Sequence, residues 1–458
     1  MTTRRSFLRS SAAASALVTA PYIWTSSQAR AQDANSKLTV ASIGVGGSRG
    51  RYNRGGAVAR QAARLGQMIA VCDVDERHSA EFSDDFDGKP KTYIDYREML
   101  EKEKPEIVTI GTPDHWHVPI AIEALRSGAD VYCEKPLTLT IQEGIEICKV
   151  VKETGKVFQV GTQQRSEMDQ MFLKAVAIVQ SGRLGKNVNA YVAIGGAPSG
   201  GEKEFPFTAK PDDLDWDMWL GPAPKVDYCE ERRRMFRWWL EYSGGKMTDW
   251  GAHHIDIAQW ALGQDKSGPV SVTAKGNFPP LIPDGFDWAA FLNGEAKLPN
   301  TYNTATKFSI DLKFENGAVL QVNDQVDRED SVKFGNGILF EGEKGRIFVN
   351  RAKLQGKLID EMSDADKEEI DAAMAKLYKG KRIAGHMQNF FDCIDDRTQP
   401  ISDVFTHHRT MTSCHLCNIA LMLGRDLKWD PKAQNFVGDD KATALMSRKS
   451  RELATATA

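Results

Sequence analysis

The segment that most constrains the fold is a glycine-rich loop between two apolar stretches near the start of the chain. Residues 38–43 (Leu-Thr-Val-Ala-Ser-Ile) predict a buried strand, and the loop Gly44-Val45-Gly46-Gly47-Ser48-Arg49-Gly50 follows at once. A helical stretch runs over 56–65, and a second apolar strand over 68–72 leads directly to Asp73. This order of strand, loop, helix and strand is typical of a βαβ unit that binds a dinucleotide.

The residue types of the loop suit a pyrophosphate. Glycines let the backbone approach the phosphates, which lie at the N-terminus of the following helix. The residues expected to bind the cofactor here are Gly44, Gly46, Gly47, Ser48 and Arg49. The third glycine of the strict spacing is displaced, since Arg49 stands in its place and Gly50 comes one residue later. Asp73 is placed to bond the ribose hydroxyls, and its charge would repel a 2′-phosphate, which favours NAD over NADP.

Strands and helices continue to alternate after this unit. Strands are predicted over 106–110, 130–133 and 157–160, and helices over 119–127 and 141–153. Such alternation predicts a parallel, doubly wound sheet, whose ligands bind at the carboxyl ends of the strands. The segments at those ends are Thr-Pro-Asp-His-Trp-His (112–117), Glu-Lys-Pro (134–136) and Gly-Thr-Gln-Gln-Arg (161–165).

The composition narrows the class of protein. With 458 residues, 41% apolar and 26% charged, the chain is neither disordered nor membrane-embedded, and its length suggests two or three domains. A net charge of -3 argues against general nucleic-acid binding. Seven cysteines are too sparse for a disulfide framework. Cys414 and Cys417 fall inside a helical pattern over 404–423, which favours buried cysteines; whether they pair stays open.

The N-terminus carries three elements in the order of an export signal. Thr-Arg-Arg-Ser-Phe-Leu-Arg (3–9) resembles the twin-arginine motif, a weakly apolar stretch covers 11–18, and Ala-Arg-Ala (29–31) resembles a cleavage site. The apolar stretch is too short to span a bilayer. Residues 1–31 are therefore predicted to be a signal peptide read by the twin-arginine export machinery, with a periplasmic location and no stable membrane span after cleavage. Twin-arginine export carries folded proteins, so a cofactor loaded in the cytoplasm is expected.

The strand-end segments together resemble the glucose–fructose oxidoreductase / inositol dehydrogenase (Gfo/Idh/MocA) family. The family pattern has the glycine loop, a Thr-Pro…His segment, Glu-Lys-Pro and a Gly-Gly…Asp-x-Gly-x-His segment. Residues 244–253 match the last of these segments. The resemblance covers roughly residues 37–425. It implies an α/β protein: a Rossmann domain over 37–160, then an α+β domain over 161–430. That second domain has an open, mostly antiparallel sheet that usually forms the oligomer interface, so a homo-oligomer is expected. Residues 431–458 are expected to be an extended tail.

In the family, the lysine of Glu-Lys-Pro and the Asp/His pair are catalytic, which carries over to Lys135, Asp249 and His253. Oxidising an alcohol requires a group that removes the hydroxyl proton while hydride leaves carbon. The Lys135 ammonium can stabilise a developing alkoxide, and His253 can take a proton with Asp249 orienting it from the same helix face. Which of Lys135 and His253 is the base stays open, and Asp249 as a helix N-cap is the structural alternative.

Further residues at the strand ends are assigned to the cofactor and the substrate. Those expected to bind the cofactor are Thr112, Pro113, His117, Glu134, Lys135 and Gln163, while Trp116, Arg165 and His254 are expected to contact the substrate. Aromatic and basic residues between 195 and 244 would either stack on sugar rings or pin this long loop to the core. No metal is expected, although histidines 115, 117, 253 and 254 leave a zinc site conceivable.

These features predict an exported enzyme that moves hydride between a ring hydroxyl of a sugar or glycoside and tightly bound NAD(H). Tight binding is expected because an exported enzyme meets little free NAD. Three alternatives stay open: a redox-neutral NAD-dependent glycoside hydrolase of the same family, a non-catalytic sugar-binding Rossmann protein, and a metal-dependent hydrolase built on the histidines. The motifs favour an uncharged, sugar-like substrate.

Overall fold

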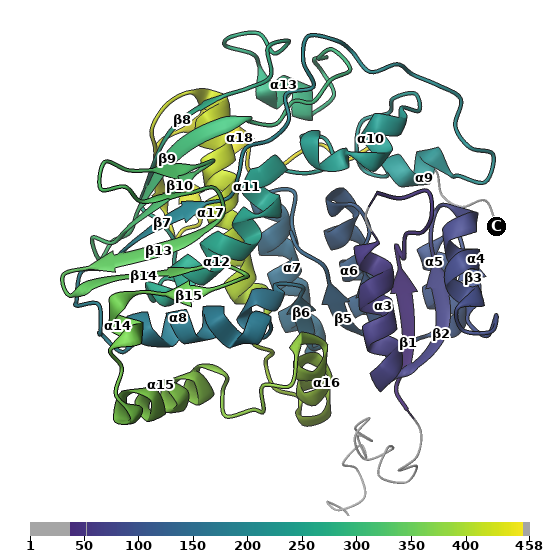
Figure 1. The fold of residues 1–458 in the computed structure, drawn as a ribbon. Coiled ribbons are helices and arrows are strands. Elements are labelled where there is room, and N and C mark those ends of the chain that lie inside the picture. Colours follow the sequence, from purple (N-terminus) through teal and green to yellow (C-terminus); the bar gives the residue numbers. More distant parts are fainter. Residues whose placement is uncertain (1–36, 52, 452–458) are drawn as a thin grey trace, which may run out of the picture. The chain divides into compact units, whose positions relative to one another are not determined.

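Two β-sheets organise the chain from Leu38 onward (Figure 1). The computed structural model describes residues 37–51 and 53–451, so the export signal expected over 1–31 lies outside the described residues. Within these described ranges, no helix is long and apolar enough to cross a membrane.

The first sheet has six parallel strands in the order β3-β2-β1-β4-β5-β6. Its elements are β1 (Thr39–Ile43), α3 (Arg54–Leu65), β2 (Gln67–Cys72), α4 (Glu76–Asp84), β3 (Lys91–Tyr93), α5 (Tyr96–Glu103), β4 (Ile107–Ile110), α6 (His117–Arg126), β5 (Asp130–Cys133), α7 (Ile141–Thr154) and β6 (Phe158–Val160). The order reverses between β1 and β4, as in a Rossmann fold, which confirms the predicted doubly wound sheet. Strands β4 and β5 are buried along their whole length, because helices cover both faces of the sheet.

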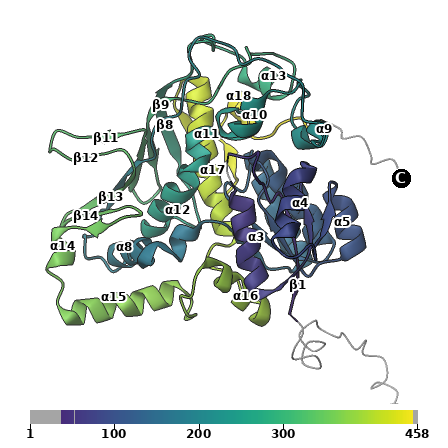
Figure 2. The ribbon, with the colours of Figure 1, turned by 45° about the vertical axis from the view of Figure 1, so that its right-hand side comes forward.

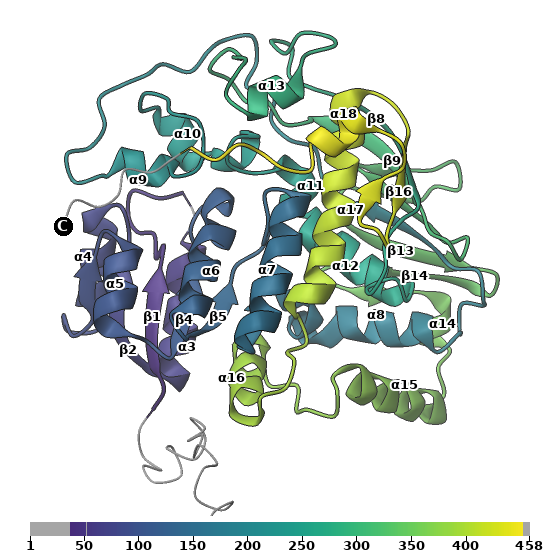
Figure 3. The same cartoon turned by 180° about the vertical axis from the view of Figure 1, so that it is seen from behind.

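A helix from the far end of the sequence completes this first half. Helix α16 (His386–Asp396) packs against α3, and its buried Phe390 and Phe391 join the apolar cluster that contains Val40 of β1. Figure 3 shows α16 below α7, on the same side of the molecule as the lower end of α3. The nucleotide-binding half expected over 37–160 therefore also includes 386–396, because the apolar face of α3 is covered by this distant segment.

The second sheet has nine strands in the order β15-β14-β13-β7-β10-β9-β8-β16-β17. They are β7 (Asn189–Ala193), β8 (Ser271–Asn277), β9 (Lys307–Lys313), β10 (Val319–Asn323), β13 (Gly337–Gly342), β14 (Gly345–Val349), β15 (Leu354–Gln355), β16 (Leu427–Asp430) and β17 (Asn435–Phe436). The pair β7–β10 is parallel and the other neighbours are antiparallel, which confirms the mostly antiparallel sheet. A separate hairpin of β11 (Val326–Asp327) and β12 (Lys333–Phe334) projects beside it (Figure 2).

Helices pack on one face of the second sheet. The principal ones are α8 (Met171–Gln180), α12 (Gly251–Ala261) and α17 (Val404–Leu423), with α15 (Asp364–Leu377) and α14 (Lys357–Asp360) beyond them. Phe308, Ile310 and Leu312 alternate along β9 with more exposed polar residues, as expected for a sheet with one covered face. Cys414 and Cys417 are buried on α17, and all seven cysteines are free and buried.

The described part of the tail expected over 431–458, residues 431–451, contains a strand and a helix. Strand β17 pairs with β16, and helix α18 (Asp440–Ala444) follows. Trp429 and Phe436 contact each other edge to face, and Leu445 is buried in the core of the second domain. These apolar side chains explain why the segment folds onto the domain.

The long segment between β7 and α12 holds only short helices in the described chain: α9 (Trp216–Leu220), α10 (Glu230–Arg234), the 3-10 helix η4 (Phe236–Trp238) and α11 (Gly245–Asp249). Its aromatic residues pack on one another; the rings of Trp216 and Trp219 are stacked with centroids 4.6 Å apart. Of the two interpretations open for these aromatics, the packed cluster fits the one in which they pin the loop.

Candidate active site

A cavity of about 510 Å³ lies at the carboxyl ends of β1, β2, β4 and β5, with second-domain residues forming the facing wall. This is the size of a small-molecule site. The predicted site residues that line it are Gly44, Gly46, Arg49, Asp73, Thr112, Pro113, Trp116, His117, Glu134, Lys135, Gln163, Asp249 and His253. Gly47, Ser48, Arg165 and His254 are not among the lining residues.

The glycine loop leaves its backbone open to the cavity. Gly44 and Gly46 have φ of 74° and 63°, which glycine adopts most readily, and a Cβ on Gly44 would lie 2.6 Å from Thr112. Asp73 Oδ2 accepts a hydrogen bond from the Gly46 amide at 2.9 Å and so fixes the loop. Thr112 Oγ1 is buried without a partner in the described chain. An open backbone, a carboxylate after β2 and an unpartnered hydroxyl together fit a dinucleotide.

Ser48 faces away from that cavity. Its amide and hydroxyl donate to Glu81 on α4 at 2.9 and 2.6 Å. These hydrogen bonds lower the pKa of Glu81 to about 2, so the carboxylate that holds Ser48 stays ionised. A Cβ on Gly47 would meet His78 and Glu81 at 2.6 Å, so Gly47 serves this packing. Ser48 and Gly47 therefore fix the loop through contacts with α4, on the side away from the cavity.

A segment of the second domain crosses the nucleotide end of the cavity. We call residues 213–219 the strap. The Glu76 amide donates to the Asp213 carbonyl at 3.0 Å, and the Asp215 amide donates to the Val74 carbonyl at 2.9 Å. Asp213 also pairs with Arg49 of the glycine loop. The strap is thus tied to both loops that flank the expected dinucleotide, an arrangement that no pattern in the sequence indicated.

Lys135 and Asp249 form the central ion pair of the site. Lys135 Nζ lies 2.6 Å from Asp249 Oδ1 and 3.0 Å from the Asp249 carbonyl oxygen. Arg237 Nε donates to the same Oδ1 at 3.3 Å. Burial by itself raises the pKa of Asp249, but the charges of Lys135 and Arg237 outweigh it and hold that pKa well below its usual range. Asp249 is therefore an anion that fixes the Lys135 ammonium.

Asp249 is the last residue of α11 and not a helix N-cap; that position is Gly244. A second helix, α12, begins at Gly251, so Asp249 and His253 do not share one continuous helix. Asp249 pairs with Lys135 and Arg237 instead of His253. The spacing of four residues that suggested a coupled Asp/His pair therefore arises across a break at Trp250.

His253 is neutral and lines the cavity. Its side chain is buried, and burial together with the charges of Lys135 and Arg351 lowers its pKa well below the usual value. In the described part of the chain Nδ1 has no hydrogen-bond partner. A neutral imidazole with an unused nitrogen beside an ammonium can accept a proton.

Two other predicted residues join the strand-end loops. His117 Nδ1 lies 2.7 Å from the Pro136 carbonyl oxygen, and Nε2 lies 3.0 Å from that of Thr112. Glu134 accepts hydrogen bonds from Arg54 Nε and Gln163 Nε2, both at 2.9 Å. His117 and Glu134 therefore hold the loops after β4 and β5 against each other and against α3.

Arg165 and His254, which are expected to contact the substrate, do not line the cavity and have partners within the protein. Arg165 is 2% exposed and donates two hydrogen bonds of 2.7 Å to Asp256 of α12. His254 is fully buried, with Nε2 3.1 Å from Asn336 Oδ1. Trp116 does line the cavity, but it is 4% exposed and its Nε1 donates to the Met218 carbonyl of the strap.

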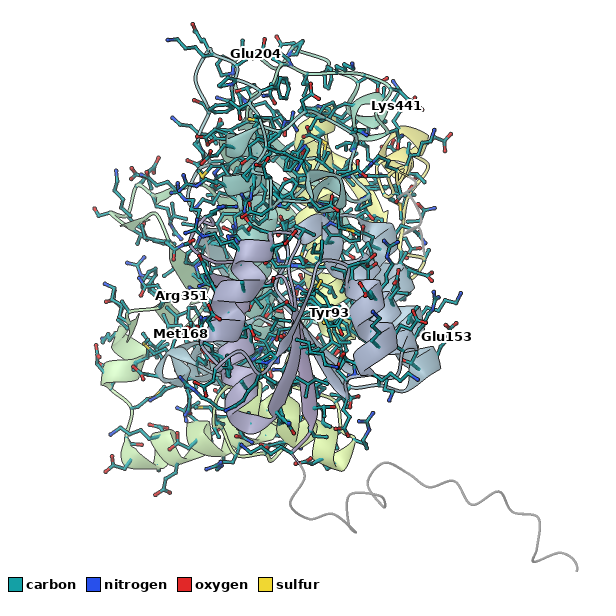
Figure 4. All side chains as sticks on the ribbon, turned by 90° about the vertical axis from the view of Figure 1, so that its right-hand side faces the viewer. Tyr93, Glu153, Met168, Glu204, Arg351 and Lys441 are labelled. Carbon is teal, nitrogen blue, oxygen red and sulfur yellow. The ribbon has the colours of Figure 1, made fainter. Side chains whose placement is uncertain are left out.

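Five cations of the second domain line the cavity and are absent from the predicted site residues: Arg233 and Arg234 on α10, Arg237 on η4, Lys246 on α11 and Arg351 after β14. The Arg351 guanidinium lies 4.6 Å from the Trp250 ring centre. Figure 4 shows Arg351 on the same flank as Met168, another lining residue. Only the basic and aromatic character of the 195–244 segment could have pointed to Arg237. No sequence pattern around Arg351 identifies it as a site residue, because the topology of the second sheet brings it to the cavity.

No group of three or more metal-ligating side chains is found among the described residues. His115 Nε2 lies 2.9 Å from the Trp219 carbonyl oxygen inside the aromatic cluster, and burial lowers its pKa to about 4. His115 and His254 are thus separately engaged in packing.

Both halves of the chain match models of one oxidoreductase family. Residues 38–162 match the model described as "Oxidoreductase family, NAD-binding Rossmann fold", so the cofactor is NAD. Residues 176–279 and 300–455 match "Oxidoreductase family, C-terminal alpha/beta domain". A likeness at the level of fold links the chain to the WlbA dehydrogenase of Chromobacterium violaceum, with a TM-score of 0.60, 19% identity and coverage of 86% of this chain and 97% of that one.

Two curated relatives are dehydrogenases of inositols. The inositol 2-dehydrogenase of Salmonella paratyphi B is 27% identical over 121 residues, and this match spans 26% of the chain and 35% of that relative. The scyllo-inositol 2-dehydrogenase (NAD(+)) of Bacillus subtilis is 24% identical over 318 residues, or 69% of this chain and 75% of that one. With both domains matched, the chain belongs to the Gfo/Idh/MocA oxidoreductase family.

Proposed function

We propose that this protein transfers hydride between a ring CH–OH group of a sugar or glycoside and NAD held in the cavity. The observation that carries the proposal is the Lys135–Asp249 pair, 2.6 Å apart, in a cavity that the neutral imidazole of His253 also lines. Bound NAD supplies the hydride acceptor. The inositol dehydrogenases among the relatives support a polyhydroxylated ring as substrate.

We assign to Lys135 the role of binding the substrate oxygen that reacts. Its ammonium has three N–H donors, and two of them are used by Asp249 Oδ1 and the Asp249 carbonyl. The third is available to a substrate hydroxyl and would stabilise the charge that develops on its oxygen. His253 then serves as the base that removes the hydroxyl proton, since its imidazole is neutral and its side chain lines the cavity.

The proposal includes export to the periplasm, with NAD retained through turnover, and assembly as a homo-oligomer. The three N-terminal elements over residues 1–31 support export. The strap supports retention, because its bonds to Glu76, Val74 and Arg49 would have to open before the cofactor leaves. Static light scattering on the purified protein measures the subunit number; a monomer contradicts the oligomer.

The test begins with the mature protein. The protein is denatured and the released nucleotide is assayed, and the holoenzyme is mixed with a panel of glycosides while absorbance of reduced NAD is followed. Absence of NAD(H), together with failure to bind added NAD(H), would reject the proposal. K135A and H253A should keep the cofactor and lose turnover. Release of the glycosidic substituent without net NAD reduction would instead identify a redox-neutral hydrolase.

A further inference from the structure

We propose that the sugar accepted by this site carries a negatively charged group, a carboxylate or a phosphate. The ring chemistry of this inference rests on the proposed function, and the negative charge rests on the side chains that line the cavity. It revises the uncharged substrate that the sequence motifs favour.

Positive charge exceeds negative charge on the cavity wall. Nine lysines and arginines line it against six aspartates and glutamates. Several of these charges neutralise one another, as Arg54 does with Glu134 and Arg233 with Asp75. The excess is greatest around Asp249, whose single carboxylate is approached by Lys135 and Arg237 and is attracted also to Lys246.

Lys246 and Arg351 form no salt bridge in the described structure; both lie beside aromatic rings, and Arg351 Nε also lies 3.2 Å from the side-chain amide oxygen of Gln164. Lys246 Nζ lies 5.9 Å from the ring centres of both Trp238 and Trp250, and Arg351 lies over Trp250. Partial burial lowers the pKa of Lys246, and burial together with the Arg54 charge lowers that of Arg351. A neutral sugar would offer these cations only hydroxyl oxygens as acceptors, whereas an anionic group would form stronger, charge-assisted hydrogen bonds with them.

The pyrophosphate of NAD is expected elsewhere. It belongs at the glycine loop after β1, whereas Lys135 follows β5, and β4 separates these strands. Neighbouring strands are about 4.8 Å apart, which puts the two loops roughly 10 Å from each other. Arg237 pairs with Asp249, Lys246 interacts electrostatically with Asp249 and Lys135, and Arg351 lies over the ring of Trp250, next to Asp249 in sequence. They are therefore assigned to the substrate.

The experiment compares ligands that differ only in charge. The NAD-loaded protein is titrated calorimetrically with methyl glucuronide against methyl glucoside, and with glucose 6-phosphate against glucose. At least one anion should bind 10-fold or more tightly than its neutral twin, and the advantage should shrink as salt is raised. The two pairs distinguish a carboxylate from a phosphate as the recognised group.

Variants of Lys246 and Arg351 test whether these cavity residues cause the preference for the charged ligand. R351Q and K246Q should each reduce the ratio of charged to neutral affinity several-fold, while R351K keeps most of it. The matched control is R346Q, which removes an exposed arginine of β14 that pairs with Asp330 outside the cavity.

Equal binding of the twins, or no binding of either anion, overturns this inference. An anion that binds preferentially but reduces no NAD, with none of the other compounds reducing it either, leaves the charge inference standing and counts against the proposed function.

Discussion

Asp249 is the residue on which the geometry of the site depends most. It holds Lys135 through two hydrogen bonds and balances the charge of Arg237. Because its carboxylate is ionised and buried, removing its charge would leave the neighbouring cations uncompensated. Asp249 is thus a positioning residue for Lys135.

We expect D249N to retain NAD but to lose about 10²- to 10³-fold in kcat/KM, since the ammonium is no longer fixed at the reacting oxygen. Stopped-flow measurement of bound-NAD reduction checks this. D371N, at an exposed position of α15, is the matched control. A D249N enzyme within threefold of the parent activity would remove Asp249 from the mechanism.

Motifs that combine a residue type with a strand end located two residues that line the cavity, whose roles stay predictions. Lys135 and Asp73 line the cavity in the way the βαβ pattern indicates. Arg165 also follows a strand, but its guanidinium donates hydrogen bonds to Asp256, 91 residues away in the sequence. That pairing depends on the tertiary fold, and a single sequence carries no local signal for it.

The strap is the element whose role is most open to direct test. Its ion pair between Asp213 and Arg49 lies at the nucleotide end of the cavity, and both side chains are partly exposed. Removing the Asp213 carboxylate leaves the backbone bonds to Glu76 and Val74 in place. The strap should therefore loosen without unfolding.

We expect D213A to release NAD several-fold faster than the parent protein, measured as cofactor lost during gel filtration and as a dissociation rate. D212A is the matched control, because Asp212 is an exposed neighbour. Identical NAD release from D213A and the parent would show that the strap does not hold the cofactor.

Helix α16 provides a second test at this scale. Phe390 is fully buried against the nucleotide-binding half. F390A should lower the free energy of unfolding by about 3–5 kcal/mol, as large-to-small changes in packed cores do. Chemical denaturation measures the loss, with E368A on exposed α15 expected to change it by less than about 0.5 kcal/mol. A loss below about 1 kcal/mol for F390A would contradict the packing.

The elements that the sequence predicted for the first sheet lie within about two residues of their observed bounds, because their hydrophobic pattern is local; α4, β3 and α5 were not predicted. The helix predicted over 404–423 has those bounds in the structure. Helix α7 begins directly after its N-cap Thr140, which forms a capping box. The strap, α16 and the β16–β17 hairpin were missed. Each is placed by contacts with residues far away in the sequence, and a local pattern cannot supply those contacts.

For the whole molecule, buried histidines set the response to acid. Burial lowers the pKa of His115, His254, His386 and His408 to about 4 and of His407 and His415 to about 3, and His253 is also well below its usual value. Such histidines bind protons more weakly when folded. Their contribution to stability is therefore complete above about pH 6.5, the unfolded value, and is lost as pH falls from there toward 4.

We expect the free energy of unfolding to be level above pH 7 and to fall steeply between pH 6.5 and 4.5. Each histidine contributes at most about 1.4 kcal/mol per pH unit. Urea denaturation across this range measures the slope. H407L should reduce the number of protons taken up on unfolding by about one and so reduce this slope. Both ring nitrogens of His407 lack partners in the described structure, so the substitution removes no hydrogen bond. Equal stability at pH 7.5 and 5 would contradict the prediction.

The position of α16 has a consequence for how the chain is made. The first sheet is complete in sequence at Val160, but the helix that covers α3 ends at Asp396. At 5–20 residues per second, a ribosome needs roughly 10–50 s to add the intervening residues. During that interval the apolar surface that Phe390 and Phe391 later cover is exposed on the nascent chain. The nucleotide-binding half is therefore the first part to be synthesised but among the last to be finished, and a chaperone has that long to bind it.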